Sequence, residues 1–273
     1  MMLQRSLPAV LLRAEPWIVW MLGAAAFAAV PIALGGIGLS WDAINHHIYL
    51  GWIIEHPRFD RDFAAAFYQA YQYPFLYWPV YKLAMAGASG VAAGVVLALM
   101  QSLAVPPAWI VARACCPGDN WADVAFRLLG VVIAFVGALT LSLLDSTSND
   151  MAAAIPLLWA IALAFLAAGI PQDEPRRVLF WIALSGFCAG IAVGFKLSNG
   201  PLVLVMPLAW AMARGTIAQR VQRVMLAGVL TIAGFVLTYG YWGWQLWVHT
   251  GNPIYPFADG AFDHLRSALG WQR

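Results

Sequence analysis

Long apolar stretches alternate with short polar ones along the chain. Seven apolar stretches contain no Asp, Glu, Lys or Arg; they cover residues 17–39, 83–112, 128–144, 151–170, 178–195, 202–213 and 225–247. A helix of about 20 apolar residues crosses the hydrocarbon core of a bilayer, which is about 30 Å thick. The pattern therefore predicts an all-α polytopic membrane protein with about seven transmembrane helices. The stretch 202–213 is short for a span and is expected to tilt or extend.

The polar positions concentrate in residues 40–81, between the first two apolar stretches. Four of the chain's 13 acidic residues and three of its five histidines lie between Asp42 and Asp62. The second half of this loop, residues 69–81, is rich in aromatic residues and proline, which is typical of a segment lying in the membrane plane. We expect one transmembrane domain over residues 1–273, with the first span at 17–39, an amphipathic first loop at 40–81, the remaining spans within 83–247 and a polar tail at 248–273.

Composition narrows the class of protein further. The chain is 62% hydrophobic and 10% charged, whereas soluble domains carry about 25% charged residues. A water-soluble fold is therefore excluded, and membrane lipids are expected partners. The basic residues are scattered, so nucleic acid is not an expected partner. Three cysteines, Cys115, Cys116 and Cys188, form neither a disulfide framework nor a metal-binding spacing.

The distribution of Lys and Arg predicts an orientation. If the loops alternate across the membrane, nine of the 15 Lys and Arg residues lie on the side of the N-terminus. The side richer in Lys and Arg is usually cytoplasmic. The N-terminus is thus expected in the cytoplasm and the 40–81 loop on the outer face of the cytoplasmic (inner) membrane. The turn at 145–150, the turn at Lys196 and the tail would share that outer face.

The first loop holds the main catalytic candidate, Asp42. Asp42, His46 and Tyr49 are spaced i, i+4, i+7, so a helix would place them on one face. A carboxylate just outside the membrane can act as a general base toward a hydroxyl acceptor, and His46 or the adjacent His47 would bind the acceptor or a phosphate. Two alternatives stay open: Ser40 caps a helix with Asp42 in its first turn, or Asp42 and a neighbouring histidine bind a metal.

Further along the same loop, Arg58 is followed by Asp60 and Asp62. An arginine here would bind phosphate, and the aspartates would lie near the acceptor. Alternatively, these mixed charges form solvated pairs that contribute little to stability.

Polar residues at the ends of later spans complete the candidate set. Asn149 and Asp150 open a span. Either Ser148 or Asn149 caps the helix with Asp150 in its first turn, or Asn149 and Asp150 are a carboxamide and a carboxylate of the site. Lys196 ends an uncharged span; it extends to the interface by default or is a counter-charge for a lipid phosphate. Asn199 lies in an Asn-Gly-Pro turn and is a further candidate.

Taken in order, these motifs resemble the bacterial branch of the GT-C superfamily, integral membrane glycosyltransferases related to the protein O-mannosyltransferases. The resemblance rests on segments 41–49 (WDAINHHIY), 58–62 (RFDRD), 69–74 (QAYQYP), 148–150 (SND), 194–199 (GFKLSN) and 251–256 (GNPIYP). It implies transfer of a sugar from a polyprenyl-phosphate carrier to an acceptor on the outer face, with Asp42 as the base or acceptor-orienting group and Lys196 near the lipid phosphate. No cofactor is fixed by it, and a divalent metal stays a candidate.

The chain also departs from that family. Members often have a second acidic residue paired with the first, and here Asp60, Asp62 and Asp150 compete for that position. Members usually have more than seven spans, so a truncated or partial member is expected. A transporter or flippase-like carrier, which would need ionisable residues in the middle of its spans, and a non-catalytic membrane scaffold are the alternatives.

Overall fold

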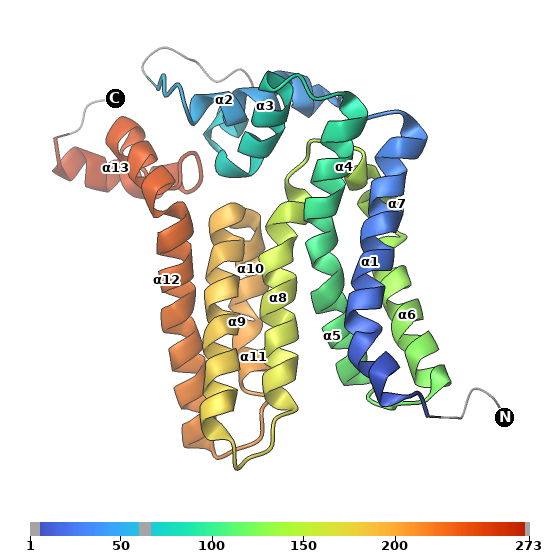
Figure 1. The fold of residues 1–273 in the computed structure, drawn as a ribbon. Coiled ribbons are helices and arrows are strands. Elements are labelled where there is room, and N and C mark those ends of the chain that lie inside the picture. Colours follow the sequence, from blue (N-terminus) through green and yellow to red (C-terminus); the bar gives the residue numbers. More distant parts are fainter. Residues whose placement is uncertain (1–5, 60–66, 271–273) are drawn as a thin grey trace.

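The structure is a computed structural model, and it describes residues 6–59 and 67–270. Its regular elements are helices; within these two ranges no strand forms, and one isolated bridge joins Ser6 to Asn120. The expected all-α class is thereby confirmed. Figure 1 shows the long helices side by side as a bundle, with short helices lying across one end.

The chain runs through the helices in a simple order. The elements are α1 (Ala9–Leu34), η2 (Ala43–His47), α2 (Ile48–Ile53), η3 (Phe67–Tyr71), η4 (Phe75–Tyr77), α3 (Trp78–Met85), α4 (Gly90–Gln101), η5 (Ser102–Ala104), α5 (Val105–Cys115), α6 (Trp121–Phe135), α7 (Ala138–Leu144), α8 (Asp150–Ala168), α9 (Pro175–Phe195), η6 (Leu197–Asn199), α10 (Gly200–Leu204), α11 (Met206–Trp210), α12 (Ile217–Thr250) and α13 (Asp259–Ala268).

Within the described residues, five helical segments are long and apolar enough to cross a membrane. They are α1, the continuous segment Gly90–Cys115, α8, α9 and α12; α6 and α7 make a sixth if this pair, bent by 72°, counts as one span. The chain is thus a multi-pass membrane protein. The span expected at 202–213, the sixth of seven, is not confirmed. This stretch forms the five-residue helices α10 and α11, and Pro207, in the first turn of α11, interrupts a continuous helix.

The bundle has two distinct ends. In Figure 1 the start of α1 lies at one end, which we call the proximal end. The other end, which we call the distal end, carries α2, α3, the first turn of α8, the last turn of α9 and α13. The polar segments expected to share one surface therefore lie together at the distal end.

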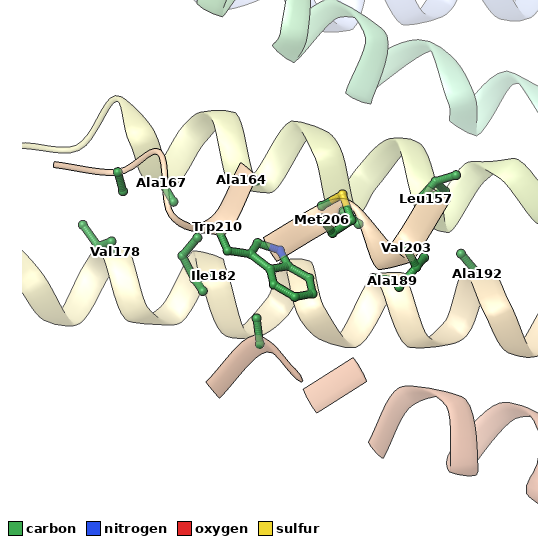
Figure 2. Close-up of a cluster of buried hydrophobic side chains, with 13 residues drawn as sticks. Leu157, Ala164, Ala167, Val178, Ile182, Ala189, Ala192, Val203, Met206 and Trp210 are labelled. Atoms are coloured by element: carbon green, nitrogen blue, oxygen red, sulfur yellow. The ribbon is translucent and has the colours of Figure 1, made fainter. Parts of the chain in front are cut away.

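Close packing of small residues fixes α8, α9 and α12 relative to one another. Gly186, Gly190 and Gly194 recur every four residues on α9 and face α12; a Cβ atom on Gly190 would lie 2.0 Å from the carbonyl oxygen of Thr231. Such spacing allows two membrane helices to approach closely. Figure 2 shows the neighbouring core, where the Trp210 ring of α11 fills the space between α8 and α9. These contacts hold the distal ends of α8 and α9 side by side.

Candidate functional site at the distal end

The start of α8 and the end of α9 bring three candidate residues together. The ammonium of Lys196 forms an ion pair with Asp150, and its Nζ lies 3.5 Å from Oδ1 of Asn149. The second carboxylate oxygen of Asp150 accepts a hydrogen bond from the Ser148 hydroxyl at 2.5 Å. The pair is partly open to solvent, with the Lys196 side chain 29% and the Asp150 side chain 51% exposed. Antiparallel packing of α8 and α9 explains this meeting of residues 46 positions apart.

Asn149 does not cap α8 with its side chain. It occupies the N-cap position, but its carboxamide makes no capping hydrogen bond. The side chain is buried and directed at Lys196 instead. The Ser148 hydroxyl accepts the backbone N–H of Asp150 at 3.3 Å. The capping interpretation thus describes Ser148, while Asn149 is a member of the site.

A π-helical turn positions Asp42 and His46. Ser40 accepts the backbone N–H of Ala43 at 3.1 Å, as expected for a helix-capping serine. Residues Ala43–His47 then form a π turn rather than the expected α-helix. Tyr49 packs against Trp52. The expected i, i+4 proximity of Asp42 and His46 is kept. Asp42 Oδ1 lies 3.9 Å from His46 Nδ1. Single π turns of this kind are frequent at functional sites.

His46 differs from Asp42 in its exposure to solvent. The Asp42 side chain is 52% exposed, whereas His46 is buried and its Nδ1 makes no hydrogen bond. Burial lowers the pKa of His46, although the nearby Asp42 carboxylate opposes this shift. A separation of 3.9 Å is too long for a direct hydrogen bond and suits a third polar group between the two. Asp42 and His46 thus form an open pair at the surface of the distal end.

His47 links the first loop to the turn before α8. Its Nδ1 lies 2.6 Å from the Thr147 hydroxyl, and its ring stacks on Tyr77 with the centroids 4.5 Å apart. Burial, and next the neighbouring His46, lower the pKa of His47 to about 4, despite the opposing carboxylates of Asp42 and Asp150. The ring is neutral at pH 7, so His47 positions the 145–150 turn rather than supplying a positive charge.

An aromatic cavity of about 120 Å³ lies beside Lys196. Asn149 and Lys196 line it, as do Tyr71, Tyr73, Tyr239 and Tyr255. Burial raises the pKa of Tyr73 to about 12, so its hydroxyl stays protonated. Asp42, His46 and His47 belong to the same end of the bundle but do not line this cavity.

The cavity residues contributed by the C-terminal part, among them Tyr239 and Tyr255, were not predicted from the sequence. Tyr71 packs edge-on against Tyr255 with ring centroids 4.8 Å apart, which joins residues 184 positions apart at one wall. The aromatic residues near both positions were visible in the sequence, but the sequence did not show that they meet.

The other candidates lie elsewhere or outside the described residues. The guanidinium of Arg58 lies 5.9 Å from the Trp52 ring centroid. The Asn199 carboxamide donates to the carbonyl oxygens of Ala153 and Ala192 at 3.1 and 2.9 Å, which ties α8 to α9. Neither residue lines the cavity. Asp60 and Asp62 lie outside the described residues.

The arrangement suits an anionic headgroup carried on an apolar chain. Lys196 supplies positive charge, Asn149 supplies a carboxamide and the tyrosines supply flat apolar faces with hydroxyl groups. Asp42 supplies an exposed carboxylate nearby on the same end. Over residues 6–59 and 67–270, no three His, Cys, Asp or Glu side chains come together as a metal site.

The chain matches no protein-family model, no curated protein and no solved structure. Its function is therefore argued from the distal end itself.

Proposed function

We propose that this protein is a membrane glycosyltransferase that moves a sugar from a polyprenyl-phosphate carrier to a hydroxyl acceptor. One observation carries the proposal: Lys196 and Asn149 line an aromatic cavity at the end of a bundle of apolar helices. A lipid-linked donor needs such a place, because its tail stays in the hydrocarbon while its phosphate and sugar require polar and flat aromatic partners. The ordered motifs shared with the GT-C superfamily support the same reaction class.

Lys196 is the partner we propose for the donor phosphate. Its present partner is the Asp150 carboxylate, and both side chains are partly exposed. Ion pairs of this kind contribute about 0–1 kcal/mol, so a phosphate can replace or share the carboxylate at little cost. The Asn149 carboxamide and the tyrosine rings would then orient the sugar. Asp150 would keep the lysine directed at the cavity when the donor is absent.

Asp42 is the group we propose as the general base. The acceptor oxygen attacks the anomeric carbon of the sugar, the bond from that carbon to the phosphate oxygen breaks, and the acceptor proton moves to the Asp42 carboxylate. The polyprenyl phosphate leaves with its charge balanced by Lys196. The unpaired Nδ1 of His46, 3.9 Å from Asp42, is suited to holding the acceptor hydroxyl.

The reaction is proposed to take place on the outer face of the cytoplasmic membrane. The excess of Lys and Arg on the side of the N-terminus supports a cytoplasmic proximal end. The distal end then faces the outside, where lipid-linked sugars meet acceptors that have been exported.

Replacing the proposed base tests the mechanism. Purified protein in liposomes is offered a panel of polyprenyl-phospho-sugars, and binding and transfer are measured separately. Asp42→Asn should lower transfer about 10²–10⁴-fold, the usual contribution of a general base, while donor binding stays unchanged. Glu55→Gln is the matched control, because this carboxylate lies at the same end but pairs with Lys82 at 2.5 Å; its transfer rate should stay within about twofold of wild type.

Two results would contradict the proposal. The first is that the wild-type protein neither binds nor turns over any polyprenyl-phospho-sugar. The second is that Asp42→Asn transfers sugar at the wild-type rate.

A further inference from the structure

Helix α13 carries an apolar stripe that faces away from the rest of the chain. Ala261, Leu265, Ala268 and Leu269 are all exposed, with Leu265 at 44% and Leu269 at 53%. At 100° per residue these positions fall along one side of the helix. A surface helix of a soluble protein has the opposite arrangement, with its apolar side against the core.

The polar side of α13 holds it to the end of α12. Arg266 is buried, and its guanidinium donates to Oδ1 of Asp259 at 2.7 Å and to the carbonyl oxygen of Thr250 at 3.4 Å. It also forms an ion pair with Asp263. These contacts hold Arg266 on the protein side, whereas Leu265 and Leu269 are exposed. The orientation of the stripe is therefore fixed by an ion network.

The adjoining end of α12 is also exposed and apolar. Toward its distal end, α12 exposes Tyr241, Trp244 and Val248, and aromatic side chains of this kind are enriched where a membrane meets water. Figure 1 shows α13 directly beyond this end of α12, lying across it rather than continuing its direction. It occupies the same end of the bundle as α2 and α3.

We propose that α13 is an in-plane membrane helix whose stripe at Leu265 and Leu269 lies between the headgroups and acyl chains of the distal leaflet. Amphipathic helices rest at this depth with their apolar side toward the hydrocarbon. The turn before α13 supplies Tyr255 and Phe257 to the cavity wall. Contact between α13 and lipid would thus hold that wall at the depth of lipid phosphates. This inference does not depend on the proposed enzymatic activity.

Depth-dependent fluorescence quenching tests the proposal. The native cysteines are replaced by serine, and single cysteines at Leu265→Cys, Leu269→Cys or Ser267→Cys are labelled with an environment-sensitive fluorophore in liposomes. Ser267 is the matched control because it is also exposed but lies about 200° around the helix from Leu265. Quenching by lipids brominated near the headgroup is compared with quenching by aqueous iodide.

The two sides of the helix should respond in opposite ways. Labels at 265 and 269 should be quenched at least about twofold more by brominated lipid than the label at 267, which iodide should quench more strongly. Equal iodide quenching at all three positions would overturn the proposal, because α13 would then lie in water. Protection of positions 265 and 269 from both quenchers would also overturn it, because a protein partner or a second copy would then cover the stripe.

Discussion

Both ends of the bundle carry ion pairs between acidic and basic side chains, but one pair is buried and the other is partly exposed. At the proximal end, Glu15 of α1 and Arg127 of α6 form a doubly hydrogen-bonded pair at 2.6 and 2.7 Å, with side chains 5% and 0% exposed. Arg127 also donates to the carbonyl oxygens of Cys116 and Gly118 at 2.8 and 2.7 Å, and Trp109 donates to Glu15 at 3.0 Å. The network is closed: its charges are buried and have several partners.

The distal end is open. Lys196 and Asp150 are partly exposed, a cavity lies beside the lysine, and the buried Nδ1 of His46 makes no hydrogen bond. Burial of a charge requires nearly complete compensation, which the Glu15–Arg127 network has and the Lys196 site lacks. Completed networks stabilise the fold, whereas incomplete ones can bind a ligand. The comparison therefore assigns stability to Glu15 and Arg127 and binding to Lys196 and its neighbours.

Breaking the proximal pair should give the largest effect on stability. Glu15→Gln leaves the Arg127 guanidinium buried without a counter-charge, and we expect a loss of about 3–5 kcal/mol in the free energy of unfolding. Glu174→Gln is the control, because Glu174 and Arg177 form an exposed pair at 3.0 Å; it should cost about 0–1 kcal/mol. Denaturant titration in detergent micelles measures both values. Equal losses of stability in the two variants would refute the distinction between buried and exposed ion pairs.

The buried histidine should make the distal end sensitive to acid. His47 has a pKa of about 4 in the folded protein against an ordinary value of 6.5. Between these values the unfolded chain binds more protons, so stability is complete above pH 6.5 and falls as the pH drops toward 4. At about 1.4 kcal/mol per pH unit, the loss by pH 5 is about 2 kcal/mol. Unfolding curves between pH 7 and pH 5 measure it.

Two substitutions test whether His47 causes the pH dependence of stability. His47→Gln should flatten the slope, although His46, whose pKa is also lowered, adds a part in the same direction. His56→Gln should keep the wild-type slope, because the His56 ring is exposed and stacks on Trp52. An unchanged slope in His47→Gln would show that another group titrates.

The smallest expected change in free energy is at Lys196, and it concerns binding. Lys196→Gln should weaken binding of a polyprenyl-phospho-sugar about tenfold, equivalent to about 1.4 kcal/mol, while the free energy of unfolding changes by less than about 1 kcal/mol. Lys82→Gln is the matched control: this lysine lies at the same end and pairs with Glu55, but it does not line the cavity. If both variants bind the donor equally well, Lys196 is not the phosphate partner.

Much of the fold follows from local pattern, and the exceptions have local causes. Apolar length predicted the spans now seen as α1, α8, α9 and α12. It failed at 202–213, where Pro207 divides the stretch into two short helices. Hydropathy counts apolar residues and is insensitive to where a proline removes a backbone donor.

The site was predictable only in part. The ends of α8 and α9 were identified as polar positions at one surface, and Asp150 and Lys196 do form an ion pair. Asn199 was a candidate for binding the substrate. In the structure its carboxamide donates hydrogen bonds that join α8 to α9. A regular α-helix was expected from Asp42 to Tyr49, but residues Ala43–His47 form a π turn. Such a turn has no distinctive composition, so the sequence could not indicate it.

By itself the sequence determined that this chain crosses a membrane repeatedly and that its polar residues gather at the ends of the spans. That much follows from the cost of placing polar groups in hydrocarbon, which acts on each segment separately. Only the tertiary structure decided which polar groups are buried with several partners and which stay partly exposed beside a cavity. Whether Glu15 meets Arg127, or Tyr71 meets Tyr255, depends on how helices distant in sequence pack, and small residues such as Gly190 set that packing through shape.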